Sequence, residues 1–137
     1  MIHFVVVDTD VLVSALLTSK EDSATVQIVK KILDGELIPL FSEATKKEYR
    51  EVLHRAKFGL SPDAVDYLLS AIFKSGISLE PASTGIAIID AKDLPFYELT
   101  LEKRKDQAYL ITGNLRHFPK EPFVVTPREI LEILEKE

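Results

Sequence analysis

An unbroken apolar run near the N-terminus constrains the fold more than any other feature of the sequence. Residues 2–7 are nearly all apolar and rich in valine, which is the pattern of a strand buried on both faces at the centre of a parallel sheet. The run stops at Asp8, Thr9 and Asp10, and a second apolar stretch follows at residues 11–17. The two carboxylates at this break could cap a helix, hold a metal ion or attack a phosphate.

Helical and extended segments alternate along the rest of the chain. Periodicity and capping residues predict helices at residues 11–17, 23–33, 42–58, 61–76, about 95–106 and 126–137, and extended segments at 2–7, 36–41, 77–81, 86–90, 108–113 and 123–125. Ser42, Ser61 and Thr126 occupy N-cap positions, and Glu129 completes a capping box with Thr126. This alternation predicts a three-layer α/β/α domain around a mostly parallel sheet.

Composition narrows the setting. At 137 residues the chain has the size of one domain, so we expect residues 1–137 to form a single unit. The absence of cysteine excludes disulfides and thiolate metal sites and fits a reducing compartment. Because no apolar run approaches the roughly 20 residues of a membrane span and the N-terminus lacks signal-peptide features, we expect a cytoplasmic protein without membrane contact. The formal charge of −5 argues against non-specific coating of DNA, but it is compatible with a local basic rim around an acidic pocket.

Oxygen-bearing side chains follow four of the predicted strands. In open parallel sheets the ligand crevice lies beyond the carboxyl ends of the strands, so these side chains are expected to meet at one edge. They are Asp8, Ser42, Asp90 or Asp93, and the segment from Thr112 to Asn114.

Glu48 is an acid on the core-facing side of the predicted helix 42–58. At 100° per residue from Ala44 it falls at about 40°, in the same half of the wheel as Tyr49 and Val52. An acid in such a place is costly unless it is paired, protonated or bound to a cation. A partly buried glutamate paired with Arg or Lys is the structural alternative.

Asp8, Glu48 and Asp93, with Asp90 nearby, therefore form a candidate cluster of hard oxygen ligands. Carboxylates without His or Cys suit Mg²⁺ or Mn²⁺ rather than zinc. Crowded acids repel one another unless a divalent ion neutralises them. Such a site favours phosphodiester hydrolysis, in which the metal activates water and stabilises charge on the phosphate oxygens.

Four motifs, in order and spacing, resemble the PIN-domain family, particularly its small bacterial and archaeal branch of toxin–antitoxin toxins. They are VVVDTDVLVSALL, the S and EY of SEATKKEYREVLHRAKF, DAKDLPF, and YLITGNLRHFP. The resemblance runs from Val5 to about Leu134. It implies a Mg²⁺- or Mn²⁺-dependent ribonuclease that cleaves RNA, with an antitoxin protein as partner and a homodimer as the assembly.

The resemblance also assigns roles to single residues. It implies that Asp8, Glu48 and Asp93 are the catalytic, metal-binding acids and that Asn114 occupies the fourth acidic position. Asp90 is an accessory ligand or a turn residue. The supporting polar side chains are Thr9, Asp10, Ser42 and Thr112.

Two positions depart from the family pattern. Family members usually carry Asn where this chain has Asp10, and often carry Asp where it has Asn114. The amide oxygen of Asn114 can ligate a cation but brings no charge, so we expect the loss of an acid at this position to weaken metal affinity. We interpret Asp10 mainly as the N-cap of the following helix, with Asp8 as the ligand.

Basic side chains near the motifs could contact the phosphates of RNA. The candidates are Arg55, Arg116 and His117, with Lys57 and Lys120 close in sequence. Solvated surface charge is the alternative for the arginines and lysines, and packing of the loop is the alternative for His117.

Other functions use the same residues. An apolar strand followed by Asp-x-Asp also resembles the haloacid-dehalogenase phosphatases, in which the first Asp is a covalent nucleophile. That interpretation leaves TGNLRHFP and Glu48 without a role, and a response-receiver interpretation lacks a clear later lysine. A PIN-like protein impaired at Asn114, which acts by binding RNA or a partner, is the non-enzymatic alternative.

Overall fold

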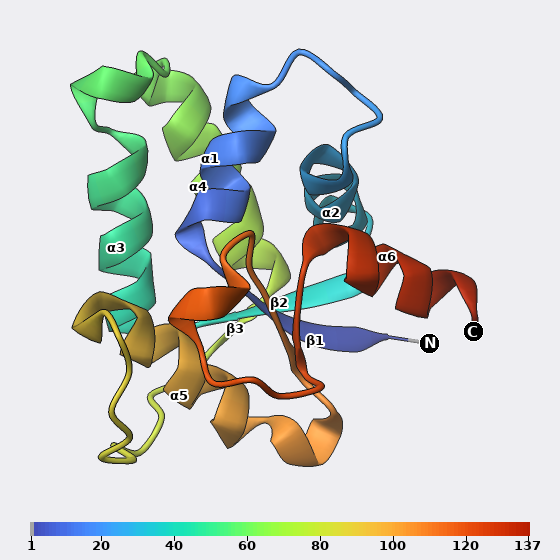
Figure 1. The fold of residues 1–137 in the computed structure, drawn as a ribbon. Coiled ribbons are helices and arrows are strands. Elements are labelled where there is room, and N and C mark those ends of the chain that lie inside the picture. The colour runs from blue at the N-terminus through green and yellow to red at the C-terminus, as the bar shows by residue number, and fades with distance from the viewer. Residues whose placement is uncertain (1) are drawn as a thin grey trace.

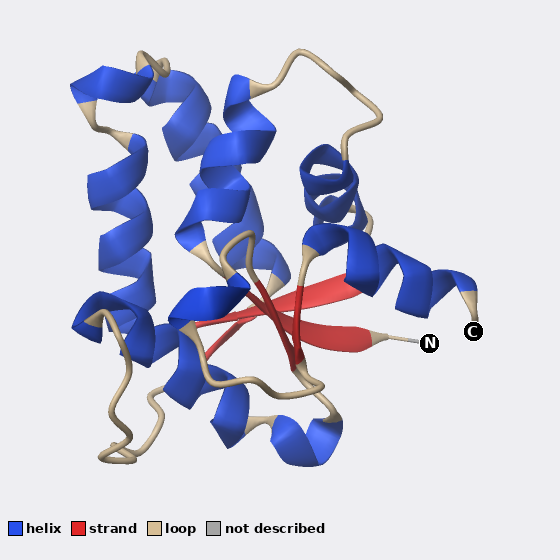
Figure 2. Ribbon diagram, in the orientation of Figure 1, coloured by secondary structure: helices blue, strands red, loops and turns tan. Residues whose placement is uncertain are grey.

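Parallel strands form the centre of the molecule. The computed structural model describes residues 2–137. Within them the strands are β1 (His3–Val7), β2 (Leu37–Phe41), β3 (Ile77–Ser78), β4 (Tyr109–Ile111) and β5 (Val124–Val125). They lie in the order β3-β2-β1-β4-β5, and all neighbouring pairs are parallel. Figure 2 shows the strands in red at the centre, with helices in blue around them. The predicted α/β class with a parallel sheet is confirmed.

Helices cover both faces of this sheet. They are α1 (Thr9–Leu17), α2 (Ala24–Leu33), α3 (Glu43–Leu53), α4 (Pro62–Ser75), α5 (Leu94–Glu102) and α6 (Pro127–Glu135). Figure 1 shows α1, α2, α4 and α6 on one side of the sheet and α5 on the other, with α3 beyond the end toward which β1 runs. None of the helices between residues 2 and 137 combines the length and apolarity that a membrane crossing needs.

β1 is the central strand, as its apolar run predicts. It pairs with β2 on one side and β4 on the other, and Val5 and Val6 are fully buried. Pro39 lies opposite Val5 in β2, where its missing N–H is tolerated because β3 pairs only with the two residues that follow it. Because β1 is third in the order of five strands, its end lies in the middle of the carboxyl edge.

The predicted helix caps are present. Ser42 caps α3, Ser61 caps α4 with Pro62 at the first helical position, and Thr126 and Glu129 form the capping box of α6. The predicted helix 42–58 is too long, because α3 ends at Leu53 and a separate 3-10 turn follows at Ala56–Phe58. Capping residues therefore predict where the helices begin more accurately than periodicity predicts where they end.

The prediction of a strand at residues 86–90 is wrong. The segment is irregular, and the extended stretch at 77–81 pairs with the sheet only through Ile77 and Ser78. The apolar side chains of Ile86 and Ile88 pack against the core without strand pairing. Asp93 consequently does not follow a strand but ends the 3-10 turn η2 (Ala91–Asp93), which leads into α5.

Candidate active site

Asp8 lies just past the end of β1, where hydrogen bonds hold both its backbone and its side chain. Its N–H donates to the Ile111 carbonyl of β4 at 2.9 Å, which extends the pairing of β1 with β4 by one residue. Its Oδ1 accepts the Thr9 N–H, and its Oδ2 accepts the Thr112 hydroxyl, both at 2.8 Å. Because Asp8 is only 8% exposed, this carboxylate is buried and fixed in orientation.

The interpretation of Asp10 as the helix cap is wrong. α1 begins at Thr9, and Asp8, with an extended backbone (φ −64°, ψ 146°), occupies the N-cap. Asp10 therefore falls in the first helical turn. Its Oδ1 accepts the Gly113 N–H at 3.4 Å, which directs the side chain toward the loop after β4. Asp8 is thus both the cap and the candidate ligand, and Asp10 is a second acid beside it.

One cleft collects most of the residues predicted from the sequence. It has a volume of about 280 Å³ and lies where the segments after β1 and β4 meet α3 and η2. Its lining residues are Asp8, Thr9, Asp10, Val13, Glu48, Val52, Arg55, Phe58, Asp90, Asp93, Asn114 and His117. The structure thus brings Asp8, Glu48 and Asp93 to one space from three distant segments.

Three predicted residues do not line this cleft. Ser42 is buried, and its hydroxyl serves the first turn of α3 as a cap. Thr112 contributes to the cleft indirectly, because its hydroxyl donates a hydrogen bond to Asp8, which lines it. Arg116 lies on two neighbouring hollows of the surface instead.

Glu48 is half-buried and faces the cleft from α3. Burial raises its pKa, and the nearby cations Lys92 and Arg55 offset part of that effect. The ion pairs along α3 join other residues, Lys46 to Glu43 and Lys47 to Glu51. The carboxylate of Glu48 is therefore directed to the cleft rather than to a pair on its own helix.

The surroundings of the acids in the cleft disfavour the negatively charged form of their carboxyl groups. Burial, followed by the neighbouring charges of Asp10 and Asp93, raises the pKa of Asp8 to about 7. Burial also raises the pKa values of Asp10 and Asp93, and Asp90 is the next cause for Asp93. Such raised values are typical of carboxylates that share one poorly hydrated space and lack a cation.

A family model for the PIN domain matches residues 4–116. The chain belongs to the PIN-domain family. No curated protein and no solved structure gives a significant match to it. PIN domains are commonly nucleases that use divalent metal ions, and membership favours this interpretation over the phosphatase and receiver alternatives.

The donor set of this PIN domain suits a divalent cation by its chemistry. It consists of carboxylate and amide oxygens, which Mg²⁺ and Mn²⁺ prefer. The hydroxyl of Thr9 is buried in the same cleft, and no residue within 2–137 partners it, which leaves it free for a bound water or ion. Within residues 2–137, however, no three His, Cys, Asp or Glu side chains are close enough to hold an ion together.

Two residues that support the PIN site were not recognised in the sequence. Tyr49, one residue after Glu48, is buried, and its hydroxyl donates to the Val7 carbonyl immediately before Asp8. Its position on the apolar face of the helix gave no sign of this bond. Lys92 brings a positive charge near Glu48 from η2, which depends on how the irregular segment folds.

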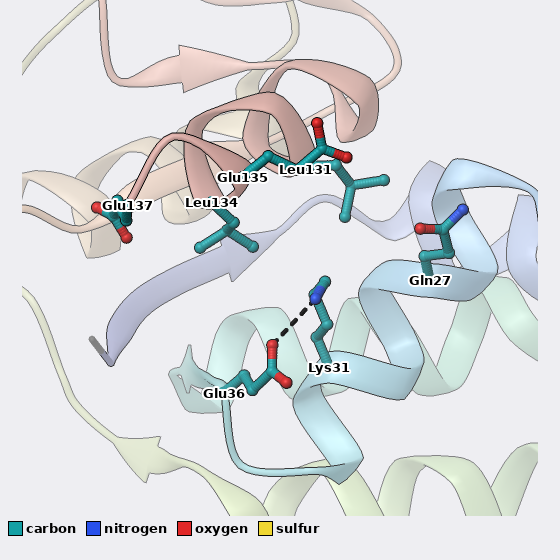
Figure 3. A pocket seen from close by; sticks show the side chains of 7 residues that line it. All are labelled: Gln27, Lys31, Glu36, Leu131, Leu134, Glu135 and Glu137. Carbon is teal, nitrogen blue, oxygen red and sulfur yellow. Dashed lines mark hydrogen bonds and ion pairs between the residues drawn. The ribbon is translucent and has the colours of Figure 1, made fainter.

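Another hollow of this PIN domain lies between α2 and α6 and shares no lining residue with the cleft that holds Asp8, Glu48 and Asp93 (Figure 3). It is lined by Gln27, Lys31, Glu36, Leu131, Leu134, Glu135 and Glu137. Lys31 and Glu36 pair with each other at 3.0 Å. None of the residues predicted for the active site lines this hollow.

Proposed function

We propose that this PIN domain is a Mg²⁺- or Mn²⁺-dependent endoribonuclease that hydrolyses phosphodiester bonds of RNA. The observation that carries the proposal is the convergence of Asp8, Glu48 and Asp93 on one cleft from the end of β1, from α3 and from η2. The raised pKa values of these acids support it, because a cation would offset the cost of burying their charged forms and, for Asp8, the repulsion of Asp10 and Asp93.

The chain supplies orientation and charge to this chemistry. The three acids, together with Asp90 and Asn114, would hold the cation. When bound, the cation would activate a water molecule and stabilise charge on the phosphate. The Thr112 hydroxyl and the Thr9 N–H orient the carboxylate of Asp8, so it need not reorganise to act as a ligand.

Basic side chains near the cleft are suited to contacts with RNA phosphates. Arg55 and His117 line the cleft, and Lys92 lies near Glu48. Arg116 faces the neighbouring hollows, where it could contact RNA that extends beyond the cleft. These contacts position the backbone and do not by themselves select a sequence.

Cleavage of labelled RNA in the presence of Mn²⁺ tests the nuclease proposal. We expect Asp8→Asn and Glu48→Gln to lower the rate more than about 100-fold, because each removes a charged ligand. Glu51→Gln is the matched control, since Glu51 lies on the same helix and pairs outside the cleft with Lys47. Absence of wild-type cleavage, or equal cleavage by all three variants, would contradict the proposal.

A binding role without cleavage is the second candidate. Two observations favour it: Asn114 replaces an acid, and the acids as they lie within residues 2–137 do not close around one ion. Under this alternative the purified protein retards labelled RNA in a gel, and neither Mn²⁺ nor Asp8→Asn changes the length of the RNA. The cleavage assay therefore separates the two candidates.

The biological role proposed for this chain is that of a cytoplasmic toxin, a homodimer that an antitoxin protein restrains. Its support is the resemblance of the four sequence motifs. Induced expression should stop growth of a bacterial host for the wild type but not for Asp8→Asn, and co-expression of the adjacent gene should restore growth. Sedimentation analysis reports the number of subunits.

A further inference from the structure

His117 connects two residues of the proposed cation site. It lies in the 3-10 turn η4 (Leu115–His117), which follows β4. Its Nδ1 is 3.2 Å from Oδ2 of Asp93, and its Nε2 is 3.0 Å from the side-chain nitrogen of Asn114. One imidazole thus spans an acid before α5 and an amide after β4.

Each ring nitrogen of His117 has one polar partner. Nδ1 faces the carboxylate of Asp93, and Nε2 faces the side-chain nitrogen of Asn114. The ring is therefore engaged on both sides by residues of the proposed cation site.

This arrangement also determines which end of the Asn114 amide is free. The bond to His117 occupies the nitrogen and leaves Oδ1 of Asn114 without a donor among residues 2–137. On the other side of the ring, His117 contacts Oδ2 of Asp93, so Oδ1 of Asp93 remains available as a ligand.

The contacts extend from His117 to Asp8. The Asn114 N–H donates to the Thr112 hydroxyl at 3.0 Å, and that hydroxyl donates to Oδ2 of Asp8 at 2.8 Å. A single series of hydrogen bonds therefore links Asp93, His117, Asn114, Thr112 and Asp8. Two acids that are far apart in the sequence are oriented by one network.

We propose that His117 is a positioning residue that orients Asp93 and Asn114 so that their free oxygens serve as cation ligands. The inference rests on the proposed cation site and explains how an uncharged amide can serve at the position of the fourth acid. The His117 side chain is 41% exposed, so it contributes little to the core, and its two ring bonds are its main interactions.

Calorimetric titration of the purified protein with Mn²⁺ tests the role directly. We expect His117→Ala to weaken Mn²⁺ binding about 10- to 100-fold, the usual cost of losing a residue that orients a ligand. His117→Gln should recover part of the affinity, because glutamine carries one donor and one acceptor. The matched control is His54→Ala: His54 bonds Asp66 and the Arg50 carbonyl outside the cleft, so affinity should not change.

The outcomes distinguish this inference from the proposed function. If the wild type binds Mn²⁺ and His117→Ala binds it equally well, the positioning role is overturned while the nuclease proposal stands. An equal loss in His54→Ala also overturns the role. If the folded wild type does not bind Mn²⁺, the proposed function fails and the inference with it. Thermal denaturation of each variant establishes that it is folded.

A double-mutant cycle tests whether His117 acts through Asn114. In an Asn114→Ala background only Asp93 remains to be oriented, so His117→Ala should cost less Mn²⁺ affinity than it does in the wild type. Costs that simply add would show that His117 and Asn114 act independently and would overturn this part of the inference.

Discussion

The hydroxyl of Thr112 donates to Oδ2 of Asp8 at 2.8 Å, across 104 residues of sequence. Both residues are buried, and they follow neighbouring central strands. The bond is one of the influences that lower the pKa of Asp8 against the larger effect of burial. It therefore helps to keep the proposed ligand in its charged form.

Thr112→Val should remove this bond, together with the acceptor of the Asn114 N–H, with little change of shape. An acceptor left buried without its donor costs about 1–3 kcal/mol of stability, and the pKa of Asp8 should rise further. We expect urea denaturation to show the lower stability and Mn²⁺ titration to show weaker binding. Thr112→Ser, which keeps the hydroxyl, is the control and should stay close to the wild type.

Replacing Asp8 should change how stability depends on pH. Its pKa is about 7 in the folded protein against 3.8 for an unperturbed side chain, so between those values the folded state holds a proton that the unfolded chain has released. The contribution of Asp8 to stability therefore falls as pH rises through this window, by about 4 kcal/mol in all. Without added metal, Asp8→Asn should be more stable than the wild type at pH 8, and the difference should vanish near pH 4. A difference that is constant with pH would contradict the assignment.

Gly113→Ala should disturb Asp10 rather than the fold. A Cβ at this position would lie 3.0 Å from Oδ2 of Asp10, which is closer than ordinary contact. We expect the Asp10 side chain to move and Mn²⁺ affinity to fall, with little change in melting temperature. In an Asp10→Ala background the same substitution should have no effect on affinity, and an undiminished effect there would point to another cause.

Gly76→Ala should be the most destabilising of these substitutions. A Cβ on Gly76 would lie 2.1 Å from the Pro39 carbonyl oxygen and 2.7 Å from its ring. Since that oxygen belongs to the backbone of β2, relief requires a shift of the strand, and we expect a loss above the usual 1–3 kcal/mol of overpacking, or about 4 kcal/mol. Gly35→Ala is the comparison: it has φ +83° with nothing within 4 Å of the added carbon, and should cost about 1 kcal/mol. Denaturation in urea measures both.

The sequence alone was sufficient for the features that depend on local chemistry and on hydrophobic pattern. The apolar run before Asp8 predicted the central strand, because only a strand buried on both faces is apolar at nearly every position. The caps at Ser42, Ser61 and Thr126 predicted where helices begin, since capping needs only residues within one turn. The helical periodicity of residues 42–58 also predicted that Glu48 lies on the core-facing side of its helix, and Glu48 lines the cleft.

Tertiary structure decided the features that depend on contacts between distant segments. Whether Asp8 or Asp10 caps α1 depended on how far the pairing of β1 with β4 extends, which the local sequence does not encode. The apolar residues at 86–90 predicted an extended segment after which Asp90 or Asp93 would follow, but Ile86 and Ile88 pack against the core without pairing with a strand. The contact of His117 with Asp93 joins residues 24 positions apart. Such contacts arise only once the sheet has brought the ends of its strands together, because no local pattern specifies them.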